Sequence, residues 1–219
     1  MTREKQMDVR RGAVVDLSHP LQAGMPVWPG DPGVFMETRT TVEVQGYRVR
    51  RLELNGHAGT HLDAPAHVLA GGAGVEAVPL ERCLGPGVVL DVRGREVVRA
   101  GDLDGIDGAA FALLRSGHDR HWGLPAYYEA FPRLDADAAR RLAAAGLRGV
   151  GLDWPSPDGP ESAELPAHKI LLDAGLVLVE NLRGLERLPE RGFLFLAAPL
   201  ALAGGDGSPV RAFALLGCG

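Results

Sequence analysis

The segment HAGTHLDAPAH, residues 57–67, collects four side chains of the types that bind metal ions in proteins. His57 and His61 are four positions apart, Asp63 follows two positions later, and His67 closes the segment. Imidazole nitrogens and a carboxylate oxygen suit zinc, manganese or iron. A metal held by only three of these side chains keeps coordination positions open for water or substrate, which is the pattern of a catalytic metal. The spacing therefore predicts a catalytic metal site in this segment.

Small residues separate these ligands and indicate the backbone that positions them. A helix would place the first two histidines on one face, but Gly56, Gly59 and Pro65 disfavour a regular helix. We therefore expect a tight, glycine-rich turn that brings the side chains together. Thr60 offers a hydroxyl group for a hydrogen bond that supports a ligand.

The elements around this segment predict a mixed α/β fold. A helix is expected at about 135–145, where an alanine-rich stretch starts at an aspartate and ends at a glycine, and a second from near Leu165 to Gly175. Strands come first and then alternate with helices, as in mixed α/β domains. Alternation and β-branched content predict the strands 13–21, 34–44, 47–55, 85–92, 109–117, 149–153, 176–182, 192–202 and 211–217.

Composition bounds the class of protein. The length of 219 residues suits one large domain, which we place at 13–219 after a polar, flexible tail at 1–12. The net charge of -5 lacks the basic footprint of a nucleic-acid-binding protein. No apolar run reaches the roughly 18 residues of a membrane span. Neither a secretion signal nor a CxxC pair is present, and the isolated Cys83 and Cys218 indicate thiols in a reducing compartment, so we expect a cytoplasmic protein.

HAGTHLDAPAH resembles, position by position, the H-x-G-T-H-x-D-x-P-x-H signature of the cyclase-like metal-dependent hydrolases. Bacterial kynurenine formamidases (arylformamidases) and isatin hydrolases belong to that family. Other segments are similar to further landmarks of the family, so the likeness spans nearly the whole chain after about residue 13: VVDLSHPLQAGMPVWPGDP, FALLRSG, GVGLDWPSPDG, AHKILLDAGLVLVENL and SPVRAFALL. The resemblance implies a mixed, swivelling β/β/α domain with a β-barrel-like core and flanking helices, assembled as a homodimer or higher homo-oligomer.

The resemblance also implies a set of metal ligands. These are His57, His61, Asp63, His67, His168 and Glu180. The first three match the ligands of one metal, and Asp63 would bridge to a second metal held by the others. In the isatin hydrolases a glutamine stands at the position of Glu180, and one metal is held. The carboxylate here favours the two-metal, formamidase type, with zinc as the expected ion and manganese as the alternative.

The activity implied by the resemblance is hydrolysis of an amide or formamide C–N bond with an aryl group on nitrogen. N-formylkynurenine is the first candidate substrate. His67 or Glu180 would then act in catalysis, by moving a proton towards the leaving nitrogen, and Trp28 would stack on the substrate ring. The alternatives are hydrolysis of a cyclic amide such as isatin, a biosynthetic cyclase, and a metal-binding protein without turnover, which open coordination positions disfavour.

Several other polar and aromatic residues lie outside the motif. His118 and His121 are three apart in a polar loop, and we expect them at the surface. The same loop, with Trp122, Tyr127 and Tyr128, is expected to help shape a pocket. His19 is expected in a turn. Asp153, Ser156 and Asp158 are expected either in a loop near the site or in an ordinary turn.

Overall fold

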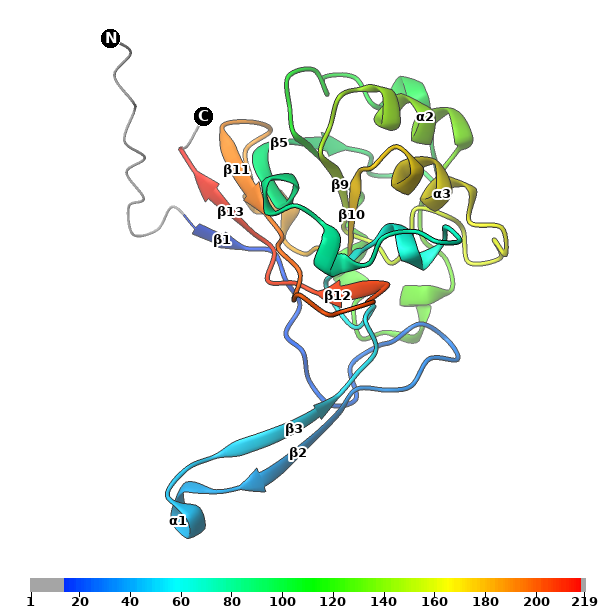
Figure 1. Cartoon of the computed structure of the whole chain (residues 1–219). Helices are drawn as coiled ribbons and strands as arrows, with labels where there is room; N and C mark the ends of the chain where they lie inside the picture. Colours follow the sequence, from blue (N-terminus) through cyan, green and yellow to red (C-terminus); the bar gives the residue numbers. More distant parts are fainter. Residues whose placement is uncertain (1–13, 218–219) are drawn as a thin grey trace.

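A mixed nine-stranded sheet is the framework of the protein in its computed structural model, which describes residues 14–217 (Figure 1). Its strands are β1 Val14–Asp16, β4 His61–Asp63, β5 Leu84–Asp91, β7 Phe111–Arg115, β9 Gly149–Leu152, β10 Val177–Glu180, β11 Phe193–Leu196, β12 Gly207–Pro209 and β13 Phe213–Leu216. They lie in the order β1–β13–β11–β5–β7–β9–β10–β4–β12. The expected tail at 1–12 lies outside the described residues.

Shorter elements complete the chain. Two pairs of strands lie outside the large sheet: β2 Phe35–Thr40 with β3 Val49–Glu53, and β6 Val97–Val98 with β8 Arg133–Leu134. The α-helices are α1 Val42–Gln45, α2 Ala136–Ala144 and α3 Pro166–Asp173. The 3-10 helices are η1 Pro65–His67, η2 Val75–Ala77, η3 Leu80–Cys83, η4 Ala100–Asp102, η5 His118–His121, η6 Pro125–Tyr128 and η7 Leu185–Arg187.

The four central strands β5, β7, β9 and β10 run parallel and are buried on both faces. Side chains alternate between the two faces of a strand. On β5, Val88 and Leu90 join the core cluster on one face, whereas Val89 joins the cluster on the other. Parallel strands covered on both sides are apolar throughout, which explains the continuous apolar runs in these segments.

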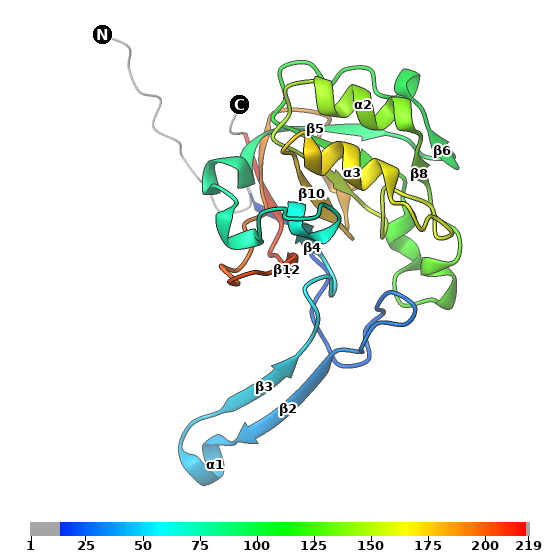
Figure 2. The ribbon, with the colours of Figure 1, turned by 45° about the vertical axis from the view of Figure 1, so that its right-hand side comes forward.

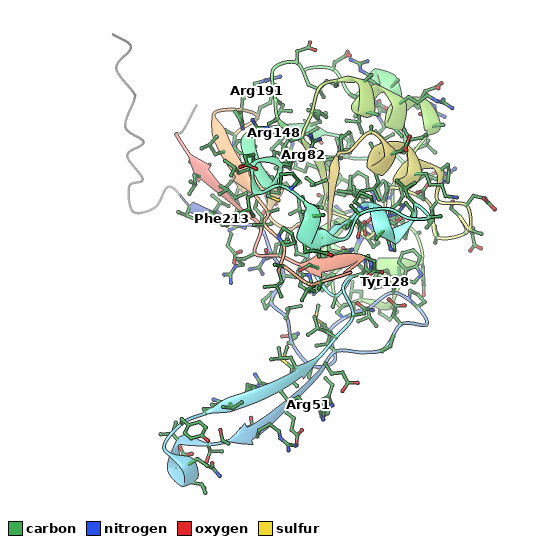
Figure 3. The ribbon with its side chains drawn as sticks, in the orientation of Figure 1. Arg51, Arg82, Tyr128, Arg148, Arg191 and Phe213 are labelled. Carbon is green, nitrogen blue, oxygen red and sulfur yellow. The ribbon has the colours of Figure 1, made fainter. Side chains whose placement is uncertain are left out.

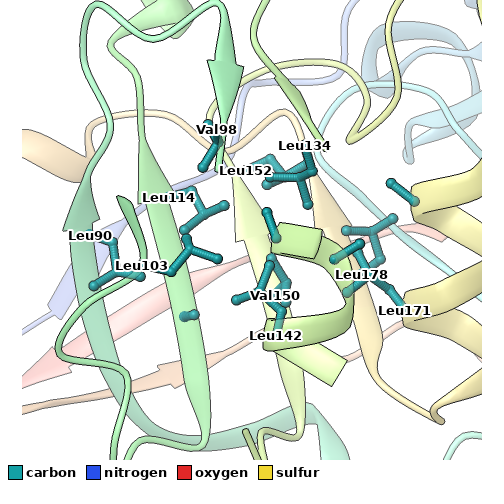
Figure 4. Packing of buried hydrophobic residues seen from close by; sticks show 14 of the residues in the cluster. Leu90, Val98, Leu103, Leu114, Leu134, Leu142, Val150, Leu152, Leu171 and Leu178 are labelled. Carbon is teal, nitrogen blue, oxygen red and sulfur yellow. The ribbon is translucent and has the colours of Figure 1, made fainter. Parts of the chain in front are cut away.

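Helices α2 and α3 cover one face of this sheet (Figure 2). Figure 4 shows the core beneath them, where Leu142 of α2 and Leu171 of α3 lie in the same cluster as Val150 of β9. Helix α2 begins after Asp135, whose carboxylate accepts a hydrogen bond from the Ala138 amide at 2.7 Å. Both helices predicted from the sequence are therefore confirmed to within a few residues.

The expected mixed α/β fold is confirmed, and the sheet curls strongly into a half-barrel (Figure 1). Antiparallel strands flank the parallel centre, and β1 pairs with β13 through Val14 opposite Leu215. The first and last described strands are thus neighbours in one sheet. That residues 13–219 form one domain stays a prediction.

Strands β2 and β3 form a hairpin that projects from the body of the protein (Figures 1 and 2). Every residue of β3 is exposed, and Figure 3 labels Arg51 on it. Apolar side chains are exposed along the hairpin as well: Phe35, Val42, Val44, Tyr47, Val49 and Leu52. An isolated two-stranded hairpin is marginally stable in water.

Some expected strand boundaries are wrong. The strand predicted at 34–44 ends at Thr40, because residues 42–45 form α1, and Gly46 ends that helix with φ at 77°. The strand predicted at 192–202 ends at Leu196, and beyond it Pro199 forms only an isolated bridge to Val210. Strands β4 and β12 carry no long alternating pattern and were not expected from the sequence.

Two further expectations concern helices and cysteines. Among residues 14–217, none of the helices is long and apolar enough to cross a bilayer. Cys83 is buried and has a free thiol. Cys218 lies outside the described residues.

Candidate metal centre

Strand β4 carries two of the predicted ligands. His61 and Asp63 are two positions apart and therefore point to the same face of the sheet, whereas Leu62 between them is fully buried in the core on the other face. The predicted turn covers only the residues before the strand, where Gly59 has φ at 70°. The expectation that a turn alone converges the ligands is wrong for His61 and Asp63, because ladders to β10 and β12 fix them.

Strand β10 supplies the carboxylate of Glu180. Its register places Glu180 directly opposite His61 across an antiparallel pair. Directly opposed residues share a face of the sheet, so the two side chains meet. Glu180 Oε2 lies 3.3 Å from His61 Nε2.

Helix α3 supplies His168 from its first turn. Asp158 fixes this end of the helix, because its carboxylate accepts hydrogen bonds from the amides of Ala167 at 2.9 Å and His168 at 3.0 Å. The same carboxylate lies 2.7 Å from His168 Nδ1. The other ring nitrogen, Nε2, lies 3.2 Å from Glu180 Oε1. Asp158, predicted either near the site or in an ordinary turn, therefore positions a ligand.

The remaining predicted ligands gather around Asp63. His57 Nδ1 lies 2.8 Å from Asp63 Oδ1, and His61 Nε2 lies 3.3 Å from the same oxygen. The ring centroid of His67, in η1, lies 4.2 Å from that of His57. The fold therefore brings all six predicted ligands to one place, although they come from residues 57–67, 168 and 180.

Two overlapping sets of these side chains have the spacing of metal ligands. One set is His57, Asp63 and His67, and the other is His61, Asp63 and Glu180. Within each set the ligand atoms lie within 4.8 Å of one another. Asp63 belongs to both, as a bridging carboxylate would. The sets pair His57 with His67, whereas the resemblance paired His57 with His61, and the assignment of each histidine to one metal stays a prediction.

The chemistry of the donors fits a divalent cation. Asp63 Oδ2 and Glu180 Oε1 are buried and, among the described residues, accept no well-aligned hydrogen bond, although His168 Nε2 lies 3.7 Å and 3.2 Å from them. Such an arrangement costs free energy unless a ligand satisfies it. His61 Nδ1 lies 2.9 Å from the Gly59 carbonyl oxygen. This contact leaves Nε2 of His61 as the metal-binding nitrogen, and Asp158 does the same for His168.

The carboxylates of the site raise the pKa values of two of the histidines. Burial lowers the pKa of His61, but Asp63 and Glu180 outweigh it and raise this pKa to about 10. Burial likewise opposes a charge on His168, yet Asp158 and Glu180 raise its pKa to about 10. The carboxylates thus hold positive charge on these rings. A metal ion must displace those protons, because only a neutral imidazole binds metal.

Comparisons with known proteins agree with this geometry. Residues 15–159 match the family model described as "Putative cyclase", which is more than half of the 219-residue chain. The chain belongs to the cyclase family. Among curated members, kynurenine formamidase of Bacillus cereus is 35% identical over 202 residues, covering 90% of this chain and 95% of the relative. Kynurenine formamidase of Salinibacter ruber is 35% identical over 209 residues, with 91% and 96% covered.

Solved structures of the cyclase family have the same fold. Isatin hydrolase A from Labrenzia aggregata has a TM-score of 0.83 at 27% identity, with 93% of each chain covered. A potential metal-dependent hydrolase with cyclase activity has a TM-score of 0.76 at 32% identity, with 92% of this chain and 96% of that chain covered. The family that the motif predicted is therefore confirmed, as is its fold.

One carboxylate of this cyclase-family site was missed from the sequence. Asp206 Oδ2 lies 3.2 Å from His57 Nε2 and 3.9 Å from His67 Nδ1. Asp206 directly precedes β12, whose pairing sets Gly207 opposite Asp63. Only the pairing of β12 with β4 reveals this contact. The local sequence, GGDGSP, indicates no more than a turn.

Asn181 is a second residue that sequence reasoning missed. Its amide nitrogen donates to the Gly59 carbonyl at 2.9 Å, and its amide oxygen accepts from the Tyr127 hydroxyl at 2.7 Å. The backbone carbonyl of Asn181 accepts from the Thr60 hydroxyl at 2.6 Å. Asn181 therefore holds the carbonyl that orients His61. Thr60 supports the site as expected, but through this backbone and not through a ligand.

A cavity of about 670 Å³ opens over the ligand cluster. Trp28, from the proline-rich loop, lines it together with Tyr128. The two rings meet edge to face, with centroids 5.6 Å apart. The cavity joins the ligand cluster to an aromatic wall. Tyr128 lines it as the sequence predicted, but Trp122 and Tyr127 do not.

The remaining histidines do not join the ligand sets. The surface position expected for His118 is wrong. Only 6% of it is exposed, because its Nε2 lies 2.9 Å from the Tyr127 carbonyl and its ring packs on that tyrosine. His19 is buried and stacks on Trp122, with ring centroids 4.0 Å apart. His121 is half-buried beside His118.

Proposed function

We propose that this cyclase-family hydrolase is a metal-dependent arylformamidase that cleaves the C–N bond of N-formylkynurenine or a similar aryl formamide. One observation carries the proposal: two ligand sets share Asp63, and the other members of both sets line a cavity together with Trp28 and Tyr128. The 35% identity with kynurenine formamidases over 90% of the chain supports the choice of substrate. We propose zinc as the metal and manganese as the alternative, because imidazole and carboxylate donors suit both.

When bound, a divalent metal supplies hydroxide at neutral pH and polarises the carbonyl group of the substrate. His57, His61, Asp63, His67, His168 and Glu180 would hold two metals, and His67 would be free for proton transfer if only one is bound. Their supporting contacts fix the ring nitrogens before substrate arrives, which is the pre-organisation that electrostatic catalysis requires.

His67 is the first candidate for proton transfer if only one metal is bound. It lies at the edge of the cluster and lines the cavity. Burial lowers its pKa, so its ring is neutral at pH 7 and can accept a proton. It would pass that proton to the leaving nitrogen as the C–N bond breaks. Glu180, which also lines the cavity, is the second candidate for this role.

The test is turnover of N-formylkynurenine, followed by absorbance, before and after metal removal with EDTA. We expect hydrolysis by the purified protein, loss of activity after EDTA, and recovery on adding back zinc or manganese alone. Metal analysis of the treated protein is the control. Hydrolysis that persists after complete metal removal would contradict the mechanism.

A cyclic amide such as isatin is the second candidate substrate. The TM-score of 0.83 with isatin hydrolase A favours it, whereas the carboxylate of Glu180 favours the formamidase reaction, since the resemblance implies a glutamine in isatin hydrolases. Comparing kcat/KM for N-formylkynurenine and isatin on one preparation distinguishes the two.

The exposed hairpin supports assembly as a homodimer or higher homo-oligomer. At its tip Val44 is 78% and Tyr47 is 58% exposed, and a second copy of the chain would bury them. We expect light scattering to give at least about twice the 23.2 kDa of one chain. The double variant Val44→Asp, Tyr47→Asp should shift the mass towards one chain, whereas Leu80→Asp, at an exposed leucine in η3, should not. A wild-type mass of one chain would contradict the assembly.

A further inference from the structure

The cavity over the ligand cluster has an uneven charge. Four carboxylates line it, from Asp31, Glu161, Glu180 and Asp206, and apart from the histidines of the ligand cluster no basic side chain among residues 14–217 does. Glu180 belongs to the ligand sets, and Asp206 faces His57. Asp31 and Glu161 have no such role, and they come from separate loops, one before β2 and one between β9 and α3.

The two remaining carboxylates are available to a ligand. Asp31 accepts one hydrogen bond, from the Asn55 side chain at 2.7 Å, which directs its carboxylate within the cavity lining. Glu161 makes no hydrogen bond or ion pair within residues 14–217. The lysine on the adjoining helix, Lys169, lies 3.8 Å from Glu164 instead.

Aromatic rings lie in the same lining. Trp28 is 36% exposed and packs between Tyr128 and Phe131, at centroid distances of 5.6 and 6.1 Å. Aromatic faces attract organic cations, and carboxylates accept strong hydrogen bonds from them. A substrate carboxylate placed beside Asp31 and Glu161 would instead meet like charge, which disfavours binding there.

We propose that this cavity selects aryl formamides whose substituent remote from the formyl group ends in an ammonium group, with Glu161 and Asp31 as the specificity-determining residues. The proposal rests on the proposed arylformamidase function. It assigns the ammonium end of the substrate to the mouth of the cavity and the formyl end to the ligand cluster. Substrates that carry only a carboxylate at the remote end are disfavoured.

The experiment compares three ortho-substituted formanilides that share one tether and end in an ammonium, a neutral amide or a carboxylate group. We expect kcat/KM to fall in that order, with the ammonium compound about tenfold ahead of the carboxylate compound, as two partly exposed charge interactions would give. The ratio should shrink as NaCl is raised, because exposed charges are screened.

Substitutions of Glu161 test whether this residue sets the preference for the ammonium compound. Glu161→Gln should lower the ammonium-to-carboxylate ratio about threefold, and Glu161→Lys should invert the preference. The matched control is Glu164→Gln, three residues along the same loop, where the side chain is 91% exposed and does not line the cavity. This control should keep the wild-type ratio.

Equal kcat/KM for the ammonium and carboxylate compounds, or a ratio unchanged in both Glu161 variants, would overturn the proposal. If none of the three compounds is hydrolysed, the proposed function fails separately. Binding of the same three compounds, measured by quenching of tryptophan fluorescence, then decides the charge preference. Tighter binding of the ammonium compound supports it, and equal or reversed affinities refute it.

Discussion

Asp63→Ala is expected to lose metal from both ligand sets and to lower kcat/KM by about 10³-fold or more, because hydroxide formation and charge stabilisation are lost together. Asp63 is the one residue common to the two sets. Its side chain is 1% exposed, and it contacts His57 and His61 directly. No other described carboxylate lies within hydrogen-bond distance of both rings.

The measurement is metal content by mass spectrometry after dialysis, together with kcat/KM. Asp63→Asn keeps the shape of the side chain and removes the charge, so it separates loss of metal from a packing defect. Circular dichroism shows that each variant is folded. The matched control is Asp137→Ala on α2. The Asp137 side chain is 78% exposed, and it forms an ion pair with Arg140, which is not a residue of the site. Wild-type metal content in Asp63→Ala would refute the ligand assignment.

Much of the site could be predicted because its ligands lie in one short segment. The spacing of His57, His61, Asp63 and His67 sufficed for a metal site, and the order of strands and helices sufficed for a mixed α/β fold. His168 and Glu180 lie more than a hundred residues away from the motif. No local pattern marks them, and only the family resemblance identified them.

What could not be predicted depends on strand pairing between distant segments. β4 and β12 have three residues each, too few for an alternating pattern to indicate a strand. Yet this pairing points His61 and Asp63 to one face and brings Asp206 to His57. Asn181 was missed for the same reason, since its partners Gly59 and Tyr127 are far away in sequence.

His118 shows how composition can mislead. The loop SGHDRHW is polar, and polar loops are usually exposed. Here the Tyr127 carbonyl provides a hydrogen-bond partner for the ring, which removes the cost of burying it. Asp119 in the same loop accepts a hydrogen bond from the Gly184 amide at 2.8 Å and ties the loop to the body. Such partners are properties of the tertiary structure.

Glu180→Gln is expected to lose one metal and to keep the other. The variant keeps the size of the side chain but removes the charge that faces His61 Nε2 at 3.3 Å and His168 Nε2 at 3.2 Å. An amide oxygen is a weaker metal donor than a carboxylate, so the metal held by Glu180 should be lost while the set of His57, Asp63 and His67 keeps its own. We expect metal content to fall by about half and kcat/KM for the formamide to fall about 10²-fold, near the cost of removing one electrostatic contact to the transition state.

The comparison with Asp63→Ala makes the Glu180→Gln result informative. If Glu180 binds metal, the two variants differ in metal content, with partial loss in Glu180→Gln and complete loss in Asp63→Ala. If Glu180 only transfers protons, Glu180→Gln keeps its full metal content and loses activity alone. Glu186→Gln, at an exposed glutamate in η7, controls for the general effect of removing a carboxylate from this region. Full metal content in Glu180→Gln would instead mean that the other ligands suffice for both metals and would leave Glu180 to proton transfer.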